Sequence, residues 1–322
     1  MTKAPQITDW KVQQLEDLTG KRYLITGGNS GIGLAAAAHL RRANADVFIA
    51  CRSRSKAADA ATLLTQIQSG GAVEIIELDL ASLDSIRSAN DEIRRHTDGL
   101  DAVINNAGVM QTPQQRTADG FELQLGTNHL GHFMLNHLIV DLITARSGRI
   151  VPVSSIAHRQ ADGINFDDPM FTRDYSPTKA YGQSKLANLM YGLELARRLD
   201  AAGSSVISVT AHPGYSATNL QSSGPTGFFN LLYKVSNPLM AQSASAGAVP
   251  EVLAAAGIEA ENGAYYGPTK FGETRGAVGE CRPSDAALNE AAASRLWSLS
   301  EDILGVKFTI NPKPSKPTAD TD

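Results

Sequence analysis

The sequence predicts an α/β fold in which a central parallel sheet is covered by helices on both faces. Short apolar runs end in Gly, Asp or Asn, and a segment with helical spacing follows each of them. The runs are continuously apolar rather than alternating, which is typical of strands that are buried on both faces of a parallel sheet. Right-handed crossovers between such strands produce a doubly wound sheet, whose ligands bind at the carboxyl ends of the strands.

The predicted elements follow one another along most of the chain. Six runs are predicted strands and a seventh, weaker one follows them: Tyr23–Thr26, Val47–Cys51, Val73–Leu78, Ala102–Asn105, Arg149–Val153, Val206–Thr210 and Ala264–Tyr266. Helical spacing appears between them, for example in Ile32–Ala43, Lys56–Gln68, Ser82–Arg95, Gly126–Leu142 and Ser184–Arg198. We therefore expect a single Rossmann-type domain with about seven strands.

This domain is predicted to span residues 21–310. Residues 1–20 are polar with little pattern and read as a lead-in. Two stretches, at about 156–180 and 219–245, are long connections between the predicted elements. Residues 311–322 are rich in Pro, Lys, Thr and Asp, a composition typical of a disordered tail.

Composition excludes several classes of function. The net charge is −4 with basic and acidic residues mixed, so nothing indicates binding to nucleic acid or to an anionic membrane. No apolar run reaches the roughly 18 to 20 residues that span a bilayer. Cys51 and Cys281 indicate neither a disulfide framework nor a metal site. Without a visible signal peptide, the reducing cytoplasm is the expected compartment.

A glycine-rich loop follows the first strand. Gly27 permits a tight turn, Gly31 lets the backbone approach a pyrophosphate, and Gly33 lets helix and strand pack closely. The helix that starts here offers free N–H groups and the positive end of its dipole to phosphates. A glycine-rich turn without a ligand is the alternative, but its place after the first strand favours a dinucleotide site. The intervening Asn29, Ser30 and Ile32 belong to the predicted site.

The end of the second strand distinguishes between cofactors. An NAD site normally has an acidic residue here, about 20 positions after the glycines, to hold the ribose 2′-hydroxyl. This chain has Cys51 and Arg52 instead, with Arg54 two positions later. A carboxylate would repel a 2′-phosphate, whereas arginine binds it. The alternative is that these arginines are solvated loop residues. The sequence favours NADP(H) over NAD(H).

Polar residues also follow the third and fourth strands. Asp79-Leu80 comes after the third, and Asn105-Asn-Ala107-Gly108 after the fourth. Asp79 could instead cap a helix, and the Asn-Asn-Ala-Gly stretch could be an ordinary turn. Both lie at the sheet edge along which a dinucleotide would run.

Tyr181 and Lys185 are four residues apart on a predicted helix, so they share one face. A free phenol has a pKa of about 10, and lowering it to near 7 requires roughly 4 kcal/mol. A neighbouring ammonium and an oxidised nicotinamide both favour the phenolate. Alone, such a pair is more often a packed tyrosine beside a surface lysine.

Two further polar residues give this pair its context. Ser155 ends the fifth strand, where its hydroxyl could hydrogen-bond a substrate oxygen as charge develops. Asn128 lies within a helix, where Asn usually needs a structural reason. It could hold a water that links Lys185 to solvent, or it could be a satisfied polar group at a helix interface.

Together these motifs resemble the short-chain dehydrogenase/reductase family over roughly residues 18 to 308. The resemblance includes a turn, Pro213-Gly214, followed by Thr218. Within the family the chain resembles the branch of retinol dehydrogenases and WW-domain oxidoreductases. The closer match is carried by Ala50-Cys-Arg52, Thr127-Asn-His-Leu-Gly-His-Phe133, Val153-Ser-Ser-Ile-Ala-His158 and Tyr265-Tyr-Gly-Pro268.

The resemblance implies NADP(H)-dependent interconversion of an aldehyde or ketone and its alcohol. Tyr181 would exchange the proton, Ser155 rather than Ser154 would orient the substrate oxygen, Lys185 would hold the nicotinamide ribose, and Asn128 would anchor the relay water. The implied cofactor contacts are Asp79 and Leu80 at the adenine, Asn105 and Gly108 at the adenosine, and Thr218 at either the nicotinamide amide or the phosphates.

The substrate side is less defined. The apolar segment 224–240 is either a lid or a packed helix, and Phe166, Met170 and Phe171 are expected to line the pocket. A small hydrophobic carbonyl or alcohol is the predicted partner, and a homo-oligomer is left open. A carbon–carbon double-bond reductase and a non-catalytic NADP(H)-binding regulator are the alternatives.

Two residue types need separate comment. Pro152 is unexpected in a central strand and suggests a bulge or a local loss of pairing before Ser155. The histidines at 129, 132, 158 and 212 have no metal-ligand spacing and are interpreted as packing or hydrogen-bonding residues, so no metal site is predicted.

Overall fold

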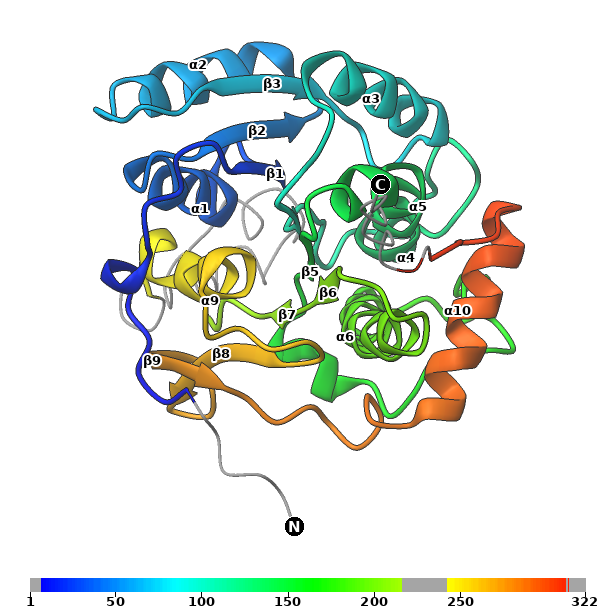
Figure 1. The fold of residues 1–322 in the computed structure, drawn as a ribbon. Helices are drawn as coiled ribbons and strands as arrows, with labels where there is room; N and C mark the ends of the chain where they lie inside the picture. Colours follow the sequence, from blue (N-terminus) through cyan, green and yellow to red (C-terminus); the bar gives the residue numbers. More distant parts are fainter. Residues whose placement is uncertain (1–6, 216–241, 311, 313–322) are drawn as a thin grey trace, which may run out of the picture.

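Six parallel strands form the centre of the molecule in the order β3-β2-β1-β4-β5-β6 (Figure 1). They are β1 Arg22–Thr26, β2 Asp46–Cys51, β3 Val73–Glu77, β4 Ala102–Asn105, β5 Arg149–Pro152 and β6 Ile207–Ser208. The computed structural model describes residues 7–215, 242–310 and 312. The order reverses between β1 and β4, the point at which doubly wound folds bind their ligands. The predicted α/β class is confirmed.

A second, three-stranded sheet continues this centre. β7 (Thr210–Ala211) follows β6 after one residue and pairs in parallel with β8 (Tyr265–Lys270), the predicted seventh strand. β8 pairs in antiparallel orientation with β9 (Arg275–Glu280), which the sequence analysis missed. Two consecutive strands joined by a tight turn lack the apolar-run-then-helix signature on which that analysis depended.

Pro152 explains why one predicted strand divides into β6 and β7. Pairing of β5 with β6 covers Arg149 and Ile150 and resumes only at an isolated bridge between Val153 and Ala211. Proline has no N–H to donate to a ladder, so pairing lapses across this stretch. On its other side Pro152 keeps an unbroken register with β4, so there is local loss of pairing but no bulge.

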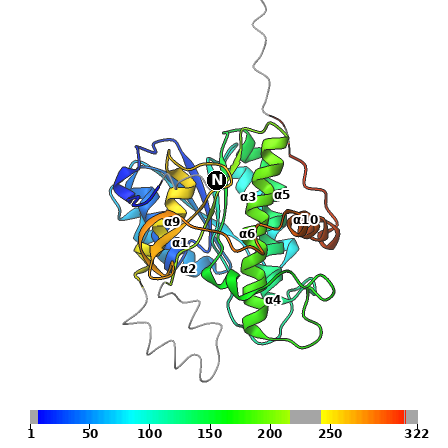
Figure 2. The same cartoon turned by 90° about the horizontal axis from the view of Figure 1, so that it is seen from below.

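Helices cover both faces of the sheet, as Figure 2 shows. One layer contains α1 (Gly31–Arg42), α2 (Arg54–Thr65) and α9 (Ala244–Ala256). The other contains α3 (Leu83–His96), α5 (Gly131–Thr144) and α6 (Pro177–Ala201), with α10 (Glu290–Leu304) packed outside α6. Short elements precede three of them: η1 Val12–Gln14, η3 Ile156–Gln160, and α4 Leu123–Leu125 with the π-helical η2 Gly126–Leu130. Helix α6 begins before Tyr181, where the sequence predicted a helix to open, with Ser176 as its N-cap and Pro177 in its first turn.

Alternate residues of the strands face two separate cores. On β1, Ile25 packs into the core beneath α1 and α9, whereas Leu24 packs into the core beneath α3 and α5. Both side chains are fully buried. This two-sided burial is the physical reason that the strands appear as continuous apolar runs.

The beginning of the chain packs against the domain. Trp10 is buried and forms an antiparallel bridge with Val278 of β9. Its indole N–H donates to Glu259 at 3.1 Å.

Among the helices of the described residues, none combines the length and apolarity that crossing a bilayer demands.

Candidate active site

A cleft of about 870 Å³ opens at the carboxyl ends of the parallel strands. It runs from the end of β2, past the first turn of α1, to the first turns of α6. Most of the predicted site residues within the described part of the chain line it: Gly27, Asn29, Ser30, Gly31, Ile32, Arg52, Asp79, Leu80, Ala107, Gly108, Ser155, Tyr181, Lys185, Pro213 and Gly214.

Three of the described predicted site residues do not line the cleft, and a fourth predicted residue is not described. Gly33, Asn105 and Asn128 are not part of the cleft lining, and Thr218, like the segment 224–240, falls outside the described residues. Asn105 is buried at the end of β4, and neither side-chain amide atom has a hydrogen-bond partner among the described residues. The side chains of Asn105 and Asn128 therefore do not form part of the cleft wall.

The glycine loop has the backbone that its residues require. Gly27 and Gly31 both have a positive φ, +68° and +56°, in the left-handed region that side chains disfavour. Gly33 serves packing, because a Cβ there would lie 2.6 Å from the carbonyl oxygen of Gly27. Any larger residue at position 33 would push the helix away from the loop.

Thr26 joins the glycine loop to the loop after β4. Its hydroxyl oxygen accepts from the Ala107 N–H at 3.0 Å, and its carbonyl accepts from Asn106 Nδ2 at 2.7 Å. His132 lies 2.9 Å from the same hydroxyl through Nε2, and its Nδ1 donates to the main-chain carbonyl of Asn128. Burial lowers the pKa of His132 to about 3, so the ring is neutral. These bonds fix the two loops that form the floor of the cleft.

Cations lie at the β2 end of the cleft. Arg52 is exposed at the rim, and Lys56, in the first turn of α2, also lines the cleft. Asp59, another turn along, joins the same wall. Arg54 does not line the cleft, because its guanidinium pairs with Glu92 and Glu77. The sequence analysis missed Lys56, although its position in the helix after Arg52 could have indicated it.

Lys185 is buried behind Tyr181 on α6. Its Nζ donates to the carbonyl of Val153 at 3.0 Å, at the end of β5. Burial lowers the pKa of Lys185 to about 8, while the negative charge of Glu251 opposes that shift. Tyr181 is 7% exposed and lies one helical turn earlier, on the cleft wall. The phenol therefore faces the cleft, with a buried ammonium on the same helix face.

The two serines after β5 have different environments. The Ser154 hydroxyl donates to the carbonyl of Lys185 at 2.8 Å and is almost fully buried. Ser155 is more exposed; it is the N-cap of η3, and its Oγ accepts from the Ala157 N–H at 3.2 Å. A hydroxyl with an accepted bond can still donate its own proton to an oxygen in the cleft. Ser155 is therefore the serine that can serve a ligand.

Asn128 holds the structure around the cleft. Its Oδ1 accepts from the Val109 N–H at 2.8 Å, and its Nδ2 donates to Val109 O and Ser184 Oγ, each at 2.9 Å. Both N–H groups are therefore used within the protein. A Cβ on Gly108 would lie 2.9 Å from Asn128 Oδ1 and 3.8 Å from Lys185 Nζ, so only glycine fits between them.

The insertion after β5 lines the cleft differently from the prediction. Its first turn supplies Ile156, Ala157 and Gln160. Phe166, Met170 and Phe171 do not line the described cleft, and that expectation was wrong. Arg295 lies over the Phe166 ring, Met170 accepts from the Glu122 N–H, and Phe171 packs against Tyr175. Each of the three side chains therefore contacts a neighbour outside the described cleft lining.

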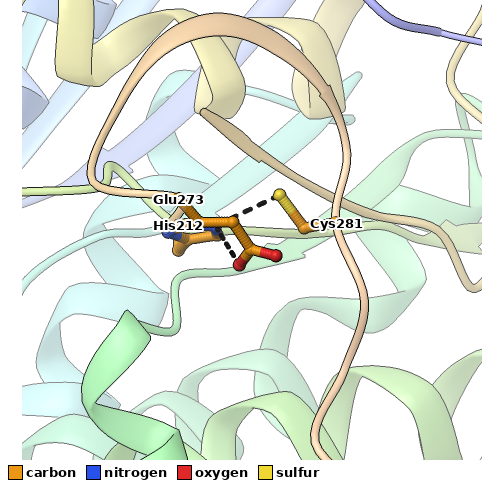
Figure 3. Close-up of side chains that lie close together, drawn as sticks. All are labelled: His212, Glu273 and Cys281. Atoms are coloured by element: carbon orange, nitrogen blue, oxygen red, sulfur yellow. Dashed lines mark hydrogen bonds and ion pairs between the residues drawn. The ribbon is translucent and has the colours of Figure 1, made fainter. Parts of the chain in front are cut away.

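His212 comes directly before the Pro213-Gly214 turn, and its ring lies beside Glu273 and Cys281 (Figure 3). Its Nδ1 accepts from the Gly214 N–H at 3.2 Å, so the neutral ring carries its hydrogen on Nε2. That atom lies 3.4 Å from Cys281 Sγ and 3.6 Å from Glu273 Oε2. Burial lowers the pKa of His212 to about 3, and Arg159 already pairs with the Glu273 carboxylate at 2.8 Å. The arrangement therefore supports the turn that borders the cleft.

Comparison with known proteins agrees with this geometry. Residues 21–226 match the short chain dehydrogenase family. Human retinol dehydrogenase 14 is 38% identical over 307 residues, which cover 89% of this chain and 87% of that protein. An uncharacterised protein from Mycobacterium paratuberculosis has a similar solved structure, with 38% identity, a TM-score of 0.78, and coverage of 94% of this chain and 100% of that one.

A more distant solved structure shares the fold. It is a short chain dehydrogenase from Burkholderia cenocepacia in complex with NADP, with 23% identity, a TM-score of 0.60, and coverage of 78% of this chain and 96% of that one. The family match covers residues 21–226, and the retinol dehydrogenases resemble most of the chain. These two findings establish the family. The chain belongs to the short-chain dehydrogenase/reductase family of oxidoreductases, in its retinol dehydrogenase-like branch.

Proposed function

We propose that this protein is an NADP(H)-dependent oxidoreductase that interconverts a hydrophobic aldehyde or ketone and its alcohol, with Tyr181 as acid and base. The observation that carries the proposal is the placement of Tyr181, Lys185 and Ser155 around one end of the cleft whose other end has Arg52 at its rim. NADP(H), when bound, would supply or accept the hydride.

The residues present fit such a cofactor. The first turn of α1 points its N–H groups into the cleft beside Gly31, which suits a pyrophosphate. Arg52 and Lys56 offer two cations at the end where a 2′-phosphate would lie. Lys185 and Tyr181 would flank the nicotinamide ribose. Asp79 and Leu80 would line the adenine.

Proton transfer would take place at the Tyr181 oxygen. In carbonyl reduction its hydroxyl gives a proton to the substrate oxygen, and in alcohol oxidation the phenolate takes one back. The Lys185 ammonium favours the phenolate through its charge. Ser155 donates a hydrogen bond to the same substrate oxygen, where negative charge develops.

The walls at this end favour an apolar substrate. Hydrophobic side chains are grouped around Tyr181 and Ser155: Val109, Met110, Leu123, Val153, Ile156 and Ala157. Sites with few polar groups bind ligands mainly by burying apolar surface. The free thiols of Cys51 and Cys281 are compatible with the reducing cytoplasm as the compartment.

NADPH oxidation with a panel of carbonyl compounds tests the activity. The panel would contain retinal, an aromatic aldehyde, a medium-length aliphatic aldehyde and a steroid ketone, with a small sugar as the polar control. We expect turnover of at least one apolar carbonyl and little of the sugar, and identification of an alcohol product. Reduction of a carbon–carbon double bond instead would overturn the proposal, as would tight NADPH binding without any turnover.

Cofactor preference has a matched pair of variants. Arg52→Ala should weaken NADPH binding by about tenfold to a hundredfold and leave NADH binding nearly unchanged, because a charge-assisted contact to the 2′-phosphate contributes roughly 1.5 to 3 kcal/mol. Arg54→Ala is the matched control, because it removes the same charge two residues later in the chain. The Arg54 side chain lies outside the cleft, so this substitution should change neither NADPH binding nor NADH binding. Fluorescence titration of both cofactors measures this. Equal losses of affinity for NADPH and NADH would show that Arg52 does not bind the 2′-phosphate.

A further inference from the structure

Glu251 is a carboxyl group in the wall of the cleft. It lies within α9, directly after Pro250, and it is fully buried. It lines the same cleft as Lys185, which comes from α6 on the opposite side of the sheet. Lys185 hydrogen-bonds Val153 at the end of β5, and α9 packs against β5 from the other face. The two helices therefore bring a buried amine and a buried carboxyl group to the wall of one cleft from opposite faces of β5.

Neither carboxyl oxygen of Glu251 has a hydrogen-bond partner among the described residues. Buried charges in proteins are normally paired, because an isolated buried carboxylate is very costly. Burial accordingly raises the pKa of Glu251 to about 8, and Lys185 is the charged group that opposes the rise. The same holds for Lys185: burial lowers its pKa, and the negative charge of Glu251 opposes that shift.

Other titratable groups near α9 form hydrogen bonds with residues other than Glu251 and Lys185. His39 of α1 hydrogen-bonds Ser245, the guanidinium of Arg149 on β5 donates to the carbonyls of Ala254 and Gly257, and Tyr266 of β8 accepts from the Glu261 N–H. On the Lys185 side, His132 is neutral. Among the described residues that line the cleft, Glu251 and Lys185 are thus the buried acid and the buried base, and each is a charged group that acts on the pKa of the other.

We propose that Glu251 is a positioning residue that acts through Lys185: its carboxylate keeps the buried Lys185 ammonium protonated into the alkaline range. As the pH rises, Glu251 gives up its proton and its negative charge then holds the proton of Lys185. The catalytic consequence rests on the proposed function, because a charged Lys185 is what favours the Tyr181 phenolate. Without Glu251, Lys185 would lose its charge at a lower pH.

The test measures Lys185 directly in the protein without cofactor. Lysine labelled with ¹³C and ¹⁵N reports the titration of each side chain by NMR, and Lys185→Met identifies the Lys185 signal by removing it. Glu251→Gln should lower the pKa of Lys185 by about one unit, a tenfold change in proton affinity. Glu251→Asp, which keeps a carboxylate, should fall between the wild type and Glu251→Gln.

Glu259→Gln is the matched control. Glu259 lies just beyond α9 and hydrogen-bonds Trp10 and Gln14, so its neutralisation removes the same formal charge away from Lys185. We expect it to leave the titration of Lys185 unchanged. A Lys185 pKa in Glu251→Gln that equals the wild-type value, in a variant with a native-like NMR spectrum, would overturn the proposal.

Activity provides a second readout. In Glu251→Gln the alkaline limb of the pH profile of kcat/KM should move to lower pH by the same amount as the Lys185 titration. A uniform loss of activity with an unmoved alkaline limb would indicate a merely structural role and contradict the proposal. If the protein turned over no carbonyl at all, the proposed function would fail, and the NMR titration would still decide the link between Glu251 and Lys185.

Discussion

Tyr181→Phe is expected to lower kcat/KM for carbonyl reduction by about a thousandfold. The substitution removes only the hydroxyl that exchanges the proton, and general acid catalysis typically contributes about 10²- to 10⁴-fold. The ring stays in place on the wall of the cleft, where it is 7% exposed. Binding of NADPH should therefore be nearly unchanged. Steady-state kinetics with the best substrate of the panel, together with a fluorescence titration of NADPH, measures both quantities.

Tyr191→Phe is the control for this substitution. Tyr191 lies on the same helix, but its hydroxyl accepts from Asn136 Nδ2 at 3.0 Å within the aromatic cluster of Phe133 and Trp297, outside the cleft. Its loss should cost about 1 kcal/mol of stability and leave kcat/KM unchanged. Full activity in Tyr181→Phe would rule out the mechanism, whatever the control showed.

Glu251→Gln is expected to become more stable relative to the wild type as the pH rises. The folded-state pKa of Glu251 is raised from 4.5 to about 8, so the folded protein holds a proton that the unfolded chain has already released. The stabilisation is fully present below about pH 4.5 and is lost as the pH rises through about 8. At about 1.4 kcal/mol per pKa unit, the loss is at most roughly 5 kcal/mol.

Urea unfolding of the wild type and the variant between pH 5 and 9 measures this difference. The gap in the free energy of unfolding should widen with pH and level off above about pH 8, since the glutamine amide does not titrate. The alkaline loss of the Lys185 charge occurs in both proteins and, because it comes earlier in the variant, acts in the same direction. Glu259→Gln should keep a constant offset from the wild type. A constant offset for Glu251→Gln as well would mean that Glu251 is ionised throughout.

Local features of the chain predicted the fold and much of the candidate site. Continuous apolar runs followed by helical spacing located the six parallel strands, because strands that are buried on both sheet faces consist mainly of apolar residues. Tyr181 and Lys185 are one helical turn apart, so their common face follows from helix geometry alone. Gly27 and Gly31 stand where the backbone adopts a positive φ.

Features that depend on distant partners were not predictable in this way. The Ser154 hydroxyl differs from that of Ser155 only because α6 places the carbonyl of Lys185 beside it. Phe166 was placed in the pocket on its apolarity, but the side chain of Arg295, 129 positions later, covers it instead. Nothing in the sequence around Glu251 indicates that it lines the same cleft as a lysine 66 residues earlier.

By itself the sequence determined the doubly wound fold, the glycine-rich loop and the tyrosine–lysine pair that we propose to be catalytic, since each depends on residues that are close along the chain. The tertiary structure decided which polar groups share an environment: Glu251 and Lys185 on the wall of one cleft, the engagement of both Asn128 N–H groups, and the hydrogen bond from the Gly214 N–H to His212. The physical reason is that burial and charge act through space. Packing of helices on opposite faces of the sheet, rather than spacing in the sequence, determines which of these groups meet.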